Sequence, residues 1–197
     1  MKLLLTSDAF STPAINQAFI GLLPKGAAGS SVLVVHSPAK NEYIKNSIAQ
    51  LGDLGLHVTA IDLDHLDNAP ILNVFDAIYI CGGNTYEYLE KIRASTFDKT
   101  IQQFVSAGGI YVGVSAGSII AGPTIDVAGI GALPDDNAFD LKNTLGLHLT
   151  DYIISPHYTE DEEPHVQKFE SHSLMKVTRL RDGQALLVKD DDTAELI

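Results

Sequence analysis

The chain has 197 residues, of which 45% are hydrophobic, so it can bury a sizeable core as one domain spanning residues 1–197. Its formal net charge of -12 argues against nucleic acid and anionic membrane surfaces as partners. Cys81 is the only cysteine, and no stretch approaches the ~20 apolar residues that span a bilayer. Together with the lack of a signal-peptide core at the N-terminus, these features predict a cytoplasmic protein.

Short apolar runs alternate with helical patterns over the first part of the chain. Strands are expected at 2–5, 32–36, 58–61, 77–80 and 110–114, and helices at 15–23, 41–54 and 86–107, the last broken or double. Continuous apolar strands separated by helices predict an α/β fold with a buried, mostly parallel sheet, helices on both faces and right-handed crossovers.

The alternation becomes less regular beyond Pro123. The expected segments are a loop over 126–140, a strand at 152–155, a helix from about 164, and strands at 177–180 and 185–188. The Asp182-Gly183 pair between the last two strands is typical of a β-hairpin turn.

A Gly-x-Ser-x-Gly pattern, Gly113-Val114-Ser115-Ala116-Gly117, follows the apolar run at 110–112 and precedes a small-residue helical pattern. This is the sequence form of a nucleophile elbow, a strand-to-helix turn so crowded that its neighbours are glycine. The turn would place the Ser115 hydroxyl over the first backbone amides of the helix, which suit a developing oxyanion. An ordinary glycine-rich turn with an incidental serine is the alternative.

A serine hydroxyl needs a base, and His157 follows the strand expected at 152–155. Because the carboxyl ends of parallel strands share one sheet edge, His157 and Ser115 are expected to lie together. His36, which also ends a strand, is a second candidate base. Asp182 is the first choice for the acid that orients the histidine, with Asp126 and the four acids at 160–163 as alternatives.

Cys81-Gly82-Gly83-Asn84-Thr85 ends another strand. Two glycines let a backbone amide approach a ligand closely, so the amides of Gly83 and Ala116 are candidates for a two-donor oxyanion hole. A plain strand-to-helix turn capped by Asn84 or Thr85 explains the segment equally well. Cys81 itself fits a buried strand residue better than a nucleophile.

Four motifs in this order resemble peptidase family S51, which includes dipeptidase E and cyanophycinase. They are Cys81 to Tyr86, Gly113 to Ser118, Pro123-Thr124-Ile125 and Ser155-Pro156-His157-Tyr158. The resemblance implies a class I glutamine amidotransferase-like, flavodoxin-like three-layer sandwich. It also implies Ser115 as nucleophile, His157 as base, Asp182 as acid, and the amides of Gly83 and Ala116 as oxyanion donors.

The chain departs from dipeptidase E in two places. The Asn-Asp-Met-Pro stretch of that enzyme corresponds to 129–134 here, which contain no acid, and its arginine-rich segment corresponds to 164–168, which contain no arginine. Lys168 or His165 would substitute only in part for arginine in binding a carboxylate, and Lys168 and Asn84 are the candidate substrate-binding residues.

The sequence therefore predicts a serine hydrolase that cleaves small peptides by a Ser-His-acid mechanism without strict selectivity for Asp. Acids near 160–163 are expected to read the free amino end of the substrate, no cofactor or metal is expected, and a homodimer is a candidate assembly. One alternative is an α/β-hydrolase-type esterase, in which Asp126 would serve as the acid because the acid precedes the histidine. Another is a flavodoxin-like binder of small molecules with a degenerate site.

Overall fold

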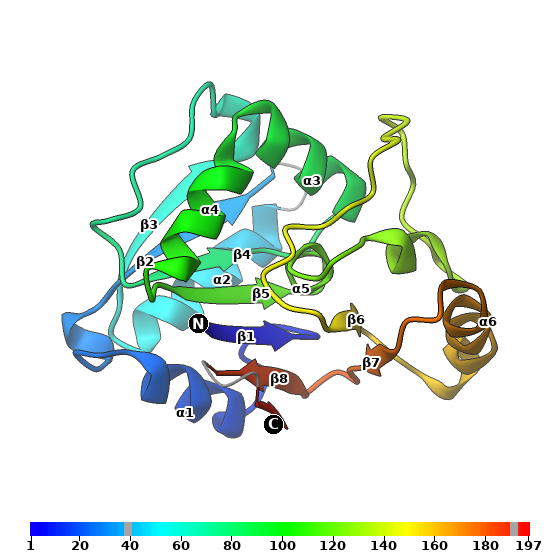
Figure 1. Cartoon of the computed structure of the whole chain (residues 1–197). Helices are drawn as coiled ribbons and strands as arrows, with labels where there is room; N and C mark the ends of the chain where they lie inside the picture. The colour runs from blue at the N-terminus through cyan, green and yellow to red at the C-terminus, as the bar shows by residue number, and fades with distance from the viewer. Residues whose placement is uncertain (38–40, 190–192) are drawn as a thin grey trace.

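The computed structural model of the protein describes residues 1–37, 41–189 and 193–197. Its centre is a seven-stranded sheet with the order β3-β2-β4-β5-β1-β8-β9 (Figure 1). The first five of these strands are parallel, β8 is antiparallel to β1, and β9 is antiparallel to β8. The strands are β1 (Lys2–Thr6), β2 (Ser31–His36), β3 (His57–Asp62), β4 (Ala77–Ile80), β5 (Ile110–Val114), β8 (Ala185–Val188) and β9 (Ala194–Leu196).

Helices flank this sheet, so the predicted mostly parallel three-layer α/β fold is confirmed. The principal helices are α1 (Pro13–Leu22), α2 (Asn41–Asp53), α3 (Thr85–Ala94) and α4 (Phe97–Ser106). The connections through α1 and α2 run toward the β3 edge, whereas the connection through α3 and α4 runs the opposite way. Right-handed crossovers therefore place the two pairs on opposite faces. The helix predicted at 86–107 is divided into α3 and α4, because Thr96 between them has a φ of 58°, which a helix does not allow.

The strands nearest the site are buried on both faces. Every residue of β4 and of β5 is buried, as a continuous apolar run in a parallel sheet requires. By contrast, β3 is an edge strand with mostly polar or half-exposed positions. The core thus centres on the strands whose ends carry the two glycine motifs.

A second, two-stranded sheet joins β6 (Ile153–Ser155) to β7 (Val177–Arg179) in parallel. It lies beyond the ends of β1 and β5, with α6 (Glu163–Ser173) on its far side (Figure 1). Short helical turns complete the chain: η1 (Ala27–Gly29), η3 (Leu63–His65), α5 (Ala116–Ile120), η4 (Asp126–Gly129) and η5 (Glu160–Glu162). Among the described residues, no helix combines the length and apolar character needed to cross a membrane.

The predicted hairpin at Asp182-Gly183 is wrong. A turn does form there, with Gln184 N donating to Arg181 O at 3.0 Å and Gly183 at a φ of 86°. The flanking strands then separate, because β7 pairs with β6 while β8 pairs with β1. All four residues of β8 are buried, so the strand gains more from the interior of the central sheet than from a two-stranded hairpin.

Glycine at position 113 is required by a close backbone approach. A Cβ added there would lie 2.5 Å from Gly117 O and 2.7 Å from Ser118 N, which are backbone atoms of the following turn. We expect Gly113→Ala to lower the free energy of unfolding by about 1–3 kcal/mol, as overpacking in a core does. Urea denaturation followed by circular dichroism measures this change.

Gly21→Ala is the matched control, because a Cβ at Gly21 meets nothing within 4 Å and the residue lies in α1. Alanine should stabilise that helix by about 0.5–1 kcal/mol. Equal stability changes of the same sign in the two variants would contradict the role of the close approach at Gly113.

Candidate active site

Ser115 stands in a strained turn between β5 and α5. Its φ of 50° and ψ of -110° are unusual for a residue with a side chain. Hydrogen bonds hold this conformation on both sides: Ser115 N donates to Thr6 O at 3.0 Å, and Ser115 O accepts from Ser118 N at 2.8 Å and Ile119 N at 3.1 Å. The predicted elbow geometry is therefore present, and it projects the hydroxyl out of the sheet end.

The end of β4 passes close to this serine. A Cβ added at Gly82 would lie 3.3 Å from Ser115 Cβ, and one at Gly83 would lie 2.6 Å from the Tyr88 ring. The glycines thus let the backbone run between Ser115 and α3. The backbone amides of Gly83 and Ala116 donate to no group within the described ranges of the chain, so they are available to a ligand oxygen.

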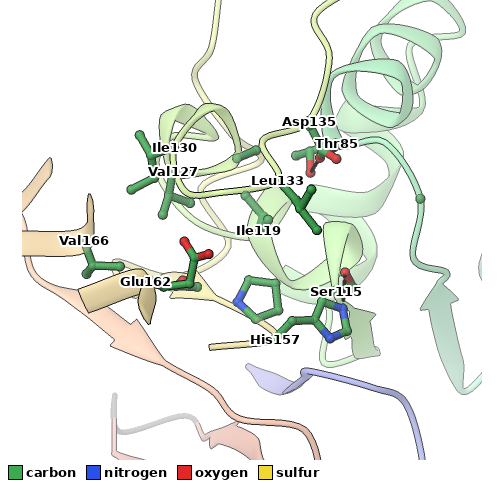
Figure 2. Close-up of a pocket in the computed structure, with 14 residues that line it drawn as sticks. Thr85, Ser115, Ile119, Val127, Ile130, Leu133, Asp135, His157, Glu162 and Val166 are labelled. Carbon is green, nitrogen blue, oxygen red and sulfur yellow. Dashed lines mark hydrogen bonds between the residues drawn. The ribbon is translucent and has the colours of Figure 1, made fainter. Parts of the chain in front are cut away.

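His157 faces Ser115 from the loop after β6. Its Nε2 lies 2.9 Å from Ser115 Oγ, and its Nδ1 lies 2.7 Å from Asp182 Oδ1. An ionised carboxylate can only accept, so Nδ1 carries the proton. Nε2 then presents its lone pair to the serine hydroxyl, which is the arrangement that a general base needs. Figure 2 shows Ser115 and His157 side by side at one end of a cleft.

Asp182 remains ionised in this setting. Partial burial raises the pKa of the Asp182 carboxyl. Hydrogen bonds from Ser7 and His157, with the attraction of the imidazole when it is protonated, outweigh burial and hold that pKa below its ordinary value. The alternative acid, Asp126, is exposed at the start of η4, and His157 bonds to Asp182 instead. The alternative base, His36, ends β2 and does not make the contact to Ser115.

Sequence reasoning missed Ser7, which is fully buried at the end of β1. Its Oγ lies 2.7 Å from Asp182 Oδ1 and 2.7 Å from the backbone N of His157. The amide can only donate and the carboxylate can only accept, so the hydroxyl must accept from His157 and donate to Asp182. The signal was a polar residue just past a buried strand, the same signal that selected His157.

Ser115 and His157 open onto a cleft of about 330 Å³. The residues that line it are Gly83, Thr85, Ser115, Ile119, Val127, Ala128, Ile130, Leu133, Asp135, Ser155, Pro156, His157, Glu162 and Val166. Most of them are labelled in Figure 2. The two predicted substrate-binding side chains are not among them. Asn84 caps α3 by accepting from Glu87 N at 3.0 Å and lines a neighbouring hollow with Ser37. Lys168 lines a separate hollow on α6.

The fold and the site together define a class: a three-layer α/β protein with a nucleophile elbow at the carboxyl end of a central parallel strand. Residues 6–196 match the model of peptidase family S51. The chain belongs to this family and is a peptidase by that membership.

Relatives and solved structures agree with this assignment. An uncharacterized peptidase of Listeria innocua is 32% identical over 159 residues, which cover 76% of this chain and 74% of that protein. A peptidase E of Shigella flexneri is 30% identical over 119 residues, covering 60% of this chain but 49% of that enzyme. The crystal structure of a candidate peptidase E protein from Listeria monocytogenes superposes with a TM-score of 0.79 at 25% identity, covering 100% of this chain and 97% of that one.

Loss of the Ser7 hydroxyl should disturb Asp182 directly. In Ser7→Ala the carboxylate loses one of its two side-chain hydrogen bonds and the His157 amide loses its acceptor, so the pKa of Asp182 should rise. The free energy of unfolding at neutral pH should fall by about 0.5–1.5 kcal/mol, because the partly buried amide of His157 loses its acceptor. Carboxyl ¹³C NMR titration and urea denaturation measure the two effects.

Ser11→Ala is the control, since Ser11 makes a similar bond to Asp8 at 2.8 Å on the exposed surface. It should leave the Asp182 pKa unchanged. An unchanged Asp182 pKa in Ser7→Ala would show that the Ser7 hydroxyl does not stabilise the carboxylate.

Proposed function

We propose that the protein is a serine-type peptidase that cleaves small peptides through Ser115, His157 and Asp182. The observation that carries the proposal is one continuous chain of hydrogen bonds, from Ser115 Oγ to His157 Nε2 at 2.9 Å and from His157 Nδ1 to Asp182 at 2.7 Å. A serine paired with a base, which is itself oriented by a third group, is the arrangement of an activated nucleophile.

In this mechanism Ser115 Oγ attacks the scissile carbonyl carbon while His157 Nε2 takes the hydroxyl proton. The carbonyl oxygen becomes an oxyanion, and the amides of Gly83 and Ala116 donate to it. His157 then gives the proton to the leaving amine, the C–N bond breaks, and an acyl ester on Ser115 remains. Water, deprotonated by the same nitrogen, hydrolyses the ester and regenerates the serine hydroxyl. Asp182 stabilises the imidazolium throughout.

The size of the cleft supports a small substrate. About 330 Å³ is at the lower end of the volumes that hold small ligands, and a long folded chain would not enter it. The chain order Ser115, His157, Asp182 differs from the Ser, acid, His order of α/β-hydrolases, so the geometry favours the peptidase over that esterase alternative. The one cysteine, Cys81, is buried and free, which fits a cytoplasmic enzyme.

The nucleophile and its base should act as one unit. We expect Ser115→Ala and His157→Ala each to lower kcat for a cleaved dipeptide by about 10³-fold or more, and the double variant to lose little further activity. Steady-state kinetics on a panel of dipeptides and acyl esters measures these values. Multiplicative losses in the double variant would show that the two residues act independently.

The identity of the acid can be tested with two isosteric changes. Asp182→Asn should keep the fold but lower kcat by about 10³- to 10⁴-fold, because the amide stabilises the wrong histidine tautomer. Asp126→Asn is the matched control and should leave kcat within about twofold, since its carboxylate is exposed away from His157. A larger loss from Asp126→Asn than from Asp182→Asn would reverse the assignment.

A further inference from the structure

One part of the cleft beside Ser115 is lined by apolar side chains. Ile119, Val127, Ile130 and Val166 line it, and Leu133 projects over it with 95% of its surface exposed. Figure 2 shows Leu133 and Ile119 close to the Ser115 end of the cleft. A nearly fully exposed leucine beside these apolar side chains gains most when an apolar group of a ligand covers it.

Only one of the four consecutive acids after His157 faces this cleft. Glu160 pairs with Arg181, and Glu163 bonds Arg179 at 2.8 Å and Tyr158 at 2.7 Å. The Arg179 guanidinium and the Tyr158 hydroxyl hold the pKa of Glu163 at about 2. The Glu163 carboxylate therefore already has its partners within the protein. Asp161 is exposed and does not line the cleft.

Glu162 is the remaining acid, and it does line the cleft. Its Oε1 accepts from Ala132 N at 3.2 Å, which ties the carboxylate to the loop that carries Leu133. This bond comes from a neutral amide, and no cation pairs with Glu162 within the described ranges of the chain. Its negative charge is therefore available to a ligand.

The rest of the cleft offers no site for an acidic side chain. Its lining, within the part of the chain that the structure describes, contains no lysine or arginine. Its other carboxylate, Asp135, accepts from Thr85 N at 2.8 Å and from Thr85 Oγ1 at 2.5 Å. A substrate carboxylate here would meet two negative charges and no fixed positive charge.

We propose that the substrate is a short peptide with a free amino end and an apolar first side chain. The apolar side chain packs against Ile119, Val127 and Leu133, and the α-ammonium group pairs with Glu162. Turnover of this substrate rests on the proposed function. Its recognition is a binding property and can be measured without catalysis.

Equilibrium binding to the Ser115→Ala variant provides that measurement. Isothermal titration with Leu-Leu, N-acetyl-Leu-Leu and Asp-Leu compares a free with a blocked amine, and an apolar with an acidic first residue. We expect Leu-Leu to bind at least about tenfold more tightly than either of the others. Equal affinity for the acetylated peptide, tighter binding of Asp-Leu, or no measurable binding of Leu-Leu would each overturn the proposal.

Two neighbouring substitutions assign the effect to Glu162. Added to the Ser115→Ala background, Glu162→Gln retains an oxygen for Ala132 N but removes the charge, and should reduce the preference for the free amine to less than about threefold. Asp161→Asn removes the same charge one residue away and should preserve it. Loss of the preference in both variants, or in neither, would contradict the assignment of the ammonium site to Glu162.

Failure of this inference differs from failure of the proposed mechanism. Labelling of Ser115 by an organophosphonate in the wild-type protein, with no preference for a free amine or an apolar first residue, refutes the substrate class alone. Tight, Glu162-dependent binding of Leu-Leu without labelling of Ser115 or hydrolysis refutes the serine mechanism and leaves the binding site standing.

Discussion

The backbone carbonyl of Thr6, at the end of β1, is the point on which the site depends. It accepts from Ser115 N at 3.0 Å and from Ser118 Oγ at 2.8 Å, and so holds both sides of the strained elbow. The next residue, Ser7, bonds the Asp182 carboxylate and the His157 backbone. The end of β1 thereby brings together Ser115, His157 and Asp182, which come from three separate segments of the chain.

The antiparallel strand β8 delivers the acid to that strand end. Thr6 pairs with Ala185 in the β1–β8 register, and Ser7 N donates to Gln184 O at 3.1 Å just beyond it. Gly183 N also donates to Asp8 Oδ1 at 2.9 Å. The turn at 181–184 is therefore held against the end of β1 by backbone pairing. Because the turn is already ordered, placing Asp182 beside His157 costs little further conformational entropy.

An ion-pair network fixes the other wall of the cleft. Arg179 on β7 donates from Nε to Glu163 at 2.8 Å and from a terminal nitrogen to Glu170 at 3.0 Å, both on α6. Leu180 N donates to Ser155 O and Tyr158 N donates to Leu180 O, which binds the His157 loop to the same small sheet. Of the four acids after His157, Glu163 thus holds α6 to β7 and Glu160 pairs with Arg181. Asp161 is exposed, and Glu162 faces the cleft.

The sequence by itself determined the buried parallel strands, the elbow at Ser115 and the two strand-end motifs, because apolar runs and glycine spacing are local properties. It also indicated His157 and Asp182, through position and family resemblance. Tertiary structure alone decided that β7 and β8 pair with different strands and that Ser7 links Asp182 to His157. It also placed Lys168 outside the cleft. These outcomes depend on contacts between segments as much as 175 residues apart, as Ser7 and Asp182 are, and no local pattern specifies which distant partner a polar side chain or strand edge will meet.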